Sequence, residues 1–245
     1  MIVHGLVIGL SLWQARGCLQ RANGRAGDRG WPMARLVAIW QDALFEVRLG
    51  NAERVAALAD EMRALVDEYA LAHGRNGYRW FRGWADARMG APLEGYRQIR
   101  EAYEENTRAG MLAGGSETLG YAAEALLLAG DYAAARRELD EALQIANGRG
   151  ERVYLVQLYL IEAGIARGLG QSAAALDCVQ RAVAEARAQQ APWLELTALV
   201  ELCEGGGATA EDRTALAALV DRLPEAIGTT ALTRARALLD DTKAV

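Results

Sequence analysis

Apolar and polar positions alternate along the chain with the period of amphipathic helices, and short glycine-containing breaks separate the apolar runs. The clearest case is residues 116–148, SETLGYAAEALLLAGDYAAARRELDEALQIANG, which predict two helices joined by a turn at Gly130. Small residues flank this turn, with Ala123 before it and Ala135 and Ala142 after it. Side chains of this size allow two antiparallel helices to approach closely. The stretch therefore predicts a tightly packed helix hairpin.

The same pattern recurs every 40 residues, because turn glycines stand at positions 50, 90, 130 and 170. The position seven residues before each glycine is small in every copy, namely Ala43, Gly83, Ala123 and Ala163. The positions 5, 9 and 12 residues after each glycine are small or apolar: Val55, Ala59 and Met62; Gly95, Ile99 and Ala102; Ala135, Leu139 and Ala142; Ala175, Val179 and Ala182. Four aligned copies indicate a repeat protein.

The repeats predict an ordered series of helices. The four hairpins pair residues 32–49 with 51–72, 76–89 with 92–109, 116–129 with 131–147, and 151–169 with 171–190. Residues 1–30 are expected to hold a partial earlier repeat and a glycine-rich loop, and residues 31–190 the four full repeats. Residues 191–245 break the spacing with helices near 191–204, 209–223 and 231–241, as a C-terminal cap would.

The pattern predicts an all-α fold, a right-handed α-solenoid of antiparallel helix hairpins similar to tetratricopeptide (TPR) repeats. The period exceeds the about 34 residues of a standard TPR and approaches that of HEAT repeats. The small residues around each turn favour the TPR interpretation, with longer helices taking up the additional residues.

Composition narrows the class of protein. The net charge is −5 and Lys243 is the only lysine, so dispersed arginines give no electrostatic reason to bind nucleic acid. The three cysteines are far apart without a CxxC pair, which favours reduced thiols in a cytoplasmic protein. The opening MIVHGLVIGLSLW is too short to span a bilayer and lacks the features of a signal peptide, so we expect no membrane partner.

Catalytic and metal-binding motifs are scarce. The two histidines, His4 and His73, have no HExxH motif and no cysteine partner at ligand spacing. The serines, Ser11, Ser116 and Ser172, lie outside any GxSxG motif. The sequence therefore predicts a non-catalytic protein without a metal or cofactor.

The first helices of the repeats are expected to line a concave groove. Aligning each repeat on its turn glycine places aromatic, basic and acidic residues on that face. The candidate residues for binding a ligand or partner are Trp40, Arg48, Arg79, Trp80, Trp84, Arg88, Glu117 and Glu124. The alternative is that the tryptophans pack between repeats. Likewise, the arginines at 75, 79 and 82 would form a solvated face neutralised by Glu101, Glu104 and Glu105.

Residues 149–202, RGERVYLVQLYLIEAGIARGLGQSAAALDCVQRAVAEARAQQAPWLELTALVEL, resemble the C-terminal TPR region of large bacterial signalling ATPases. That group includes predicted ATPases linked to adenylate-cyclase domains and large LuxR-type activators. The resemblance extends over about residues 35–241 and rests on motifs such as Gly150-Glu151-Arg152, Ala186-Arg187, Gln190-Ala191 and Glu195-Leu196, and on the tail PEAIGTTALTRARALLDD. It implies a role in bacterial signal transduction or transcriptional regulation. The chain has no GxxxxGK[ST] phosphate loop and no helix-turn-helix with a basic recognition helix, so ATPase and DNA-binding activities are not expected of it.

Together these observations predict a protein–protein interaction or effector-sensing module that binds a peptide or partner protein in its groove. A small-molecule receptor domain, which binds an inducer, is the main alternative. A homodimer formed through the apolar N-terminal residues 2–13 is a third.

Overall fold

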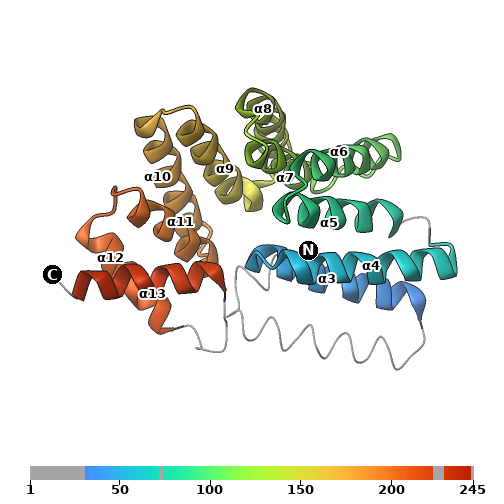
Figure 1. The fold of residues 1–245 in the computed structure, drawn as a ribbon, viewed down its shortest axis with the longest axis horizontal. Helices are drawn as coiled ribbons and strands as arrows, with labels where there is room; N and C mark the ends of the chain where they lie inside the picture. Colours follow the sequence, from blue (N-terminus) through green and yellow to red (C-terminus); the bar gives the residue numbers. More distant parts are fainter. Residues whose placement is uncertain (1–30, 72–73, 223–228, 244–245) are drawn as a thin grey trace. The chain divides into compact units, whose positions relative to one another are not determined.

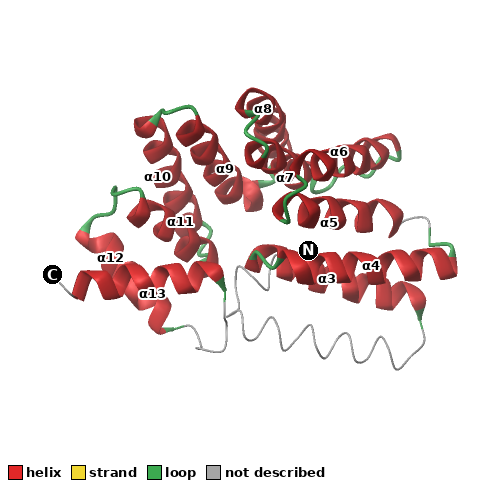
Figure 2. Ribbon diagram, viewed as in Figure 1, coloured by secondary structure: helices red, strands yellow, loops and turns green. Residues whose placement is uncertain are grey.

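The computed structural model describes residues 31–71, 74–222 and 229–243. These residues form helices and loops, with no strand among them (Figure 2). They fall into two compact units divided between Tyr154 and Leu155, which we describe separately. The predicted partial repeat in residues 1–30 and the apolar residues 2–13 lie outside the described part of the chain.

The first unit contains three helix hairpins and a short 3₁₀ helix (Figure 1). Each helix packs mainly against its neighbours in the chain, from α3 on α4 through α7 on α8. The helices are α3 (Pro32–Leu49), α4 (Ala52–Tyr69), α5 (Arg75–Arg88), α6 (Pro92–Arg108), α7 (Gly115–Leu128), α8 (Tyr132–Arg149) and η2 (Arg152–Tyr154).

The second unit continues with five helices. Helix α9 packs on α10, α10 on α11, and α11 on both α12 and α13. Their bounds are α9 (Leu155–Gly168), α10 (Ser172–Ala188), α11 (Pro192–Glu204), α12 (Ala210–Asp221) and α13 (Thr230–Lys243). In the described residues no helix is long and apolar enough to cross a membrane.

The four turn glycines end the first helix of their hairpins in the left-handed backbone region. Their φ angles are 78°, 104°, 78° and 73° at Gly50, Gly90, Gly130 and Gly170. Residues with a Cβ rarely adopt this conformation, which explains why glycine recurs at this position. In three of the four hairpins the next helix then starts with a side-chain cap, Asn51 or Asp131, or with a proline, Pro92. Helix α10, which follows Gly170, has neither.

The small positions of the repeat are buried between the helices, as predicted. Ala43, Ala123 and Ala163 are fully buried, and Gly83 is buried at the equivalent place. The approach is closest between α5 and α6, where a Cβ added to Gly95 would lie 2.3 Å from the Gly83 carbonyl oxygen. The small positions of the repeat are therefore the places where the paired helices contact each other.

The helix predicted to start at residue 151 begins later. Arg152–Tyr154 form a 3₁₀ turn, and the α-helix starts at Leu155. Glu151 lies in the connection between the left-handed Gly150, which ends α8, and this turn. Its carboxylate binds the N-terminus of α7, where Gly114 and Ser116 each donate a backbone N–H over 3.2 Å. The other predicted helices of residues 31–243 are present within a few residues of their expected ends, so the all-helical prediction is confirmed.

Candidate binding face of the first helices

Arg48, at the end of α3, makes contacts two hairpins away. It is paired with the Glu117 carboxylate of α7 and donates a hydrogen bond of 2.7 Å to the Tyr121 hydroxyl of the same helix. Its guanidinium carbon also lies 5.9 Å from the centre of the Tyr154 ring. We call these four residues the Arg48 cluster. It joins α3 to α7 although α4, α5 and α6 lie between them in the chain.

The Arg48 cluster is buried, and burial changes its acid–base properties. The side chains of Arg48 and Glu117 are 10% and 9% exposed. Burial raises the pKa of the Glu117 carboxyl above its usual value, while the nearby Arg48 acts in the opposite direction. Burial likewise raises the pKa values of the Tyr121 and Tyr154 phenols, so both stay protonated at neutral pH. The cluster therefore keeps hydroxyl donors beside a desolvated ion pair.

The start of α7 is held by the same region of the chain. Besides accepting the two backbone N–H groups, Glu151 accepts a hydrogen bond from the Ser116 hydroxyl. A carboxylate at this place satisfies helix donors that have no partner within the helix and interacts favourably with the helix dipole. Glu151 thus fixes the residue that precedes Glu117 in the chain.

A second group, the Arg88 cluster, consists of Trp84, Arg88 and Glu124. The Arg88 guanidinium carbon lies 4.8 Å from the centre of the Trp84 ring, within the range of a cation–π contact. Its Nη2 donates a hydrogen bond of 2.5 Å to Glu124 Oε1. Helices α5 and α7 are thereby joined through one arginine.

The tryptophans belong to an aromatic core between these helices. Trp80 meets Phe81 and Tyr121 edge to face, at centroid distances of 4.3 Å and 5.3 Å. Trp40 meets Phe81 in the same way at 5.3 Å. Trp80 and Trp84 are buried, whereas Trp40 is partly exposed. Packing between repeats, the alternative considered from sequence, therefore accounts for much of their environment.

Three buried polar atoms in this region have no hydrogen-bond partner among the described residues. They are Trp80 Nε1, Trp84 Nε1 and Glu124 Oε2. Nearly all buried polar groups in proteins are hydrogen-bonded, so these three atoms are exceptions within the core of the first helices.

The structure brings most of the predicted groove residues together, and it also identifies partners that the sequence did not single out. Arg48 meets Glu117, and Trp84, Arg88 and Glu124 form one cluster. Arg79 instead pairs over 2.9 Å with Glu105 of α6. This agrees with the alternative interpretation of the sequence, in which acidic residues neutralise a solvated arginine face. Tyr121, Glu151 and Tyr154 were not predicted. The only signal for Glu151 was its place after Gly150, where a helix was expected to start.

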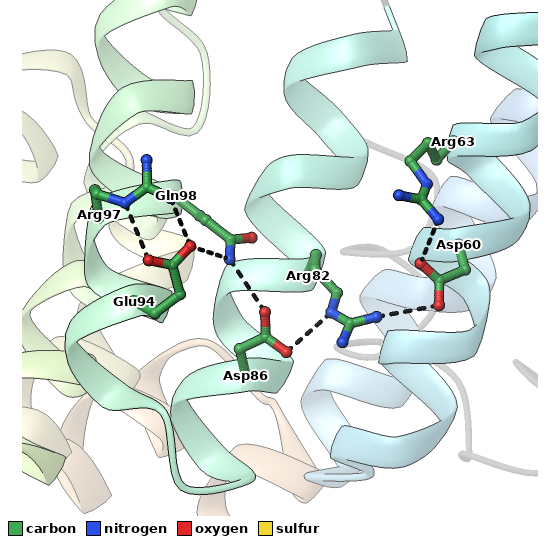
Figure 3. Close-up of polar contacts among 7 residues, drawn as sticks. All are labelled: Asp60, Arg63, Arg82, Asp86, Glu94, Arg97 and Gln98. Carbon is green, nitrogen blue, oxygen red and sulfur yellow. Dashed lines mark hydrogen bonds and ion pairs between the residues drawn. The ribbon is translucent and has the colours of Figure 1, made fainter.

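A separate ladder of polar side chains crosses helices α4, α5 and α6 (Figure 3). Arg82 donates to Asp60 over 3.1 Å and to Asp86 over 2.9 Å, and Gln98 donates to Asp86 over 3.1 Å. Arg97 and Arg63 extend it at the two ends. Most of these side chains are substantially exposed, and exposed ion pairs contribute little stability, so we interpret the ladder as a solvated helix surface.

No protein-family model matches this chain, and no curated protein matches its sequence. Within the described residues, no group of three or more His, Cys, Asp or Glu side chains is arranged to hold a metal ion.

Proposed function

We propose that the chain is a non-catalytic binding module, a right-handed TPR-like solenoid that binds a peptide or partner protein on the face of α3, α5 and α7. By the resemblance of residues 149–202, it would serve a bacterial signalling or transcriptional regulator in the cytoplasm. Its role is recognition rather than chemistry.

One observation carries this proposal: charged and aromatic side chains from α3, α5 and α7 gather in the Arg48 and Arg88 clusters. Buried charge pairs add little net stability compared with apolar residues of similar size. In the Arg48 cluster the pKa values of Glu117, Tyr121 and Tyr154 are raised, and ionisable groups with shifted pKa values often mark functional sites. Arginine and tryptophan also supply a large share of the binding energy at protein interfaces.

The test is selection from a displayed library of random peptides on the full chain, followed by titration of the selected peptides. Tryptophan fluorescence provides the readout. We expect Arg88→Ala to weaken binding at least about tenfold, because a charge-assisted hydrogen bond is lost. Arg97→Ala is the matched control, since the ion pairs of Arg97 among the described residues are with Glu94 and Glu101 of its own helix α6. Failure to enrich any peptide, or peptides that ignore Arg88→Ala, would contradict the proposal.

The second candidate function is a small-molecule effector site. The buried polar atoms without partners favour it, because a small polar molecule could satisfy them without an extended interface. A panel of small metabolites tested by thermal shift distinguishes the two functions. A saturable rise in the unfolding temperature with one metabolite, without any peptide binding, would support the effector.

A further inference from the structure

Helix α13 departs from the packing order of the other helices. In the earlier hairpins, the helix that follows a hairpin packs mainly on its second helix, as α5 does on α4 and α11 on α10. Helix α13 instead packs on both helices of the α11–α12 hairpin and lies across it (Figure 1). Its Arg234 forms ion pairs with α11. Helix α13 therefore covers part of a first helix, the kind of helix that carries the candidate binding face in the first unit.

The contact centres on four charged side chains, Arg167, Glu201, Glu204 and Arg234, which we call the Glu201 cluster. Arg234 donates to Glu201 Oε1 over 2.7 Å and to Glu204 Oε1 over 2.8 Å. Arg167 of α9 donates to Glu201 Oε2 over 2.6 Å. The pair of Arg167 with Glu201 joins two successive first helices, as the Arg88 cluster does for α5 and α7. Arg234 thus binds two carboxylates on the face of α9 and α11.

Few apolar side chains hold α13 in place. Leu232 and Ala235 are buried, whereas the other described side chains within the helix are partly or fully exposed. The Arg234 side chain is itself 40% exposed, and ion pairs of this kind contribute little and are screened by salt. Segments with few buried apolar contacts open locally, at a lower free energy than global unfolding. We therefore expect α13 to detach before the rest of the second unit unfolds.

The helix beneath α13 is largely apolar around its circumference. Ala198, Leu199 and Val200 of α11 are consecutive and all buried, so its neighbours α10, α12 and α13 cover more than half of its circumference. Such a helix is stable only when it is covered. Glu201 and Glu204, three residues apart, lie on the same side of α11. Departure of α13 would uncover apolar surface next to these two carboxylates, and an apolar helix with a basic residue would fit it.

We propose that the face of α9 and α11 is a second binding surface, that α13 is its occupant within the chain, and that an amphipathic helix of a partner protein replaces α13 there. Helix α13 indicates what the partner helix must carry. It needs an arginine for Glu201 and Glu204, an aliphatic residue two positions earlier and a small residue one position later, as Leu232 and Ala235 are placed around Arg234. All of these residues belong to the second unit, so the inference does not depend on the binding proposed for α3, α5 and α7.

The probe is a fluorescein-labelled peptide of residues 229–243, the sequence of α13 itself, titrated onto the full chain and followed by fluorescence anisotropy. In the unsubstituted chain α13 is tethered beside its surface at an effective concentration on the order of millimolar, so the added peptide should bind weakly. Arg234→Ala in the chain weakens the tethered helix, and we expect it to tighten binding of the added peptide at least about tenfold. Arg236→Ala is the matched control, because Arg236 lies on the same helix and forms no ion pair among the described residues.

A second pair of variants tests the chemistry of the contact. A peptide with Arg234→Ala should bind the Arg234→Ala chain at least about tenfold more weakly than the unsubstituted peptide does. Leu232→Asp in the chain empties the surface by another route, because the new charge resists burial, and it should also tighten binding of the unsubstituted peptide. Thermal unfolding checks that each variant is folded. Equal affinity for the chains with and without these substitutions, or no binding to either variant, would overturn the proposal and leave α13 as a permanent cap.

Hydrogen exchange of the unsubstituted full chain gives an independent test. After correction for sequence, we expect the amides of α13 to exchange at least about tenfold faster than those of α11, and faster still as salt is added. Exchange of both helices at one rate would show that α13 leaves only on global unfolding, and would overturn the proposal. So would a dimer, detected by light scattering, that Arg234→Ala dissociates, because α13 of a second copy would then be the occupant.

Discussion

Arg48 and Glu117 are both largely excluded from water, so each depends on the other. Removing one member of a buried ion pair leaves the other charge desolvated and unpaired, which costs about 3 kcal/mol or more. A pair that is open to solvent on one side, such as Arg79–Glu105 with about a third of each side chain exposed, contributes about 1 kcal/mol or less. The two pairs therefore differ in importance although their chemistry is the same.

We expect Glu117→Gln to lower the free energy of unfolding by about 3 kcal/mol, and Glu105→Gln by less than about 1 kcal/mol. Urea unfolding of the full chain measures both. The double variant Arg48→Met/Glu117→Gln, which contains no unpaired charge, should recover part of the loss. Equal effects of the two single substitutions would show that the Arg48 cluster is not desolvated.

Glu201 of α11 provides a pH-dependent case in the second unit. It accepts hydrogen bonds from Arg167 over 2.6 Å and from Arg234 over 2.7 Å. Burial opposes ionisation, but the two arginines prevail and hold the pKa of this carboxyl below its ordinary value of 4.5. A lowered folded-state pKa stabilises the fold above the ordinary pKa, and this contribution is lost as the pH falls through the folded-state value.

We therefore expect Glu201→Gln to destabilise the chain by about 1 kcal/mol at pH 7. The difference from the unsubstituted chain should shrink as the pH falls below 4.5. Unfolding free energies measured across this pH range provide the test, with the exposed Glu211→Gln as control. A difference that grows as the pH falls would reverse the assigned sign.

At the scale of the helix, the contact between α5 and α6 depends on two glycines. A Cβ on Gly95 would lie 2.3 Å from the Gly83 carbonyl oxygen and 2.7 Å from the Ala87 Cβ. The Gly83 carbonyl oxygen belongs to the backbone of α5, and the Ala87 Cβ is bonded directly to that backbone. Neither atom can therefore move away unless α5 and α6 separate. Gly148 of α8, in contrast, has nothing within 4 Å of such a Cβ.

Alanine substitutions at Gly95 and at Gly148 are expected to change the stability of the chain in opposite directions. Gly95→Ala should destabilise the chain by about 1–3 kcal/mol through overpacking, despite the better helix propensity of alanine. Gly148→Ala should stabilise it by up to about 1 kcal/mol, because only the propensity changes. Thermal and urea unfolding measure both, and destabilisation by both substitutions would contradict this account.

The hairpins could be predicted because their determinants are local. The 40-residue recurrence of glycine and small residues defined the turns and the contacts between paired helices. The pairing of Arg48 with Glu117 could not be predicted, because the two are 69 residues apart and meet only if successive hairpins are rotated correctly. The role of Glu151 was missed for a similar reason, since its partners lie at the start of α7.

At the scale of the whole molecule, most contacts join helices that are neighbours in the chain. Stability in such proteins is approximately a sum of hairpin terms and nearest-neighbour terms. The Arg48 cluster departs from this scheme within residues 32–154, because it joins α3 to α7.

We therefore expect Glu117→Gln to reduce amide hydrogen-exchange protection in α3 as well as in α7. Exchange measured by mass spectrometry at the level of peptides resolves the two helices. Gly95→Ala is the comparison, since its effect should centre on α5 and α6. Loss of protection confined to α7 and α8 would mean that the link does not couple distant hairpins.

The link from α3 to α7 also has a mechanical consequence. Stacked hairpins stretch or bend through small rotations at each junction, and these rotations normally add up freely along the stack. The Arg48–Glu117 pair connects the first hairpin to the third. The junctions on the two sides of the second hairpin therefore cannot open independently. Under tension applied to its ends, this part of the chain should resist as one stiff segment and yield in a single step when Arg48 separates from Glu117.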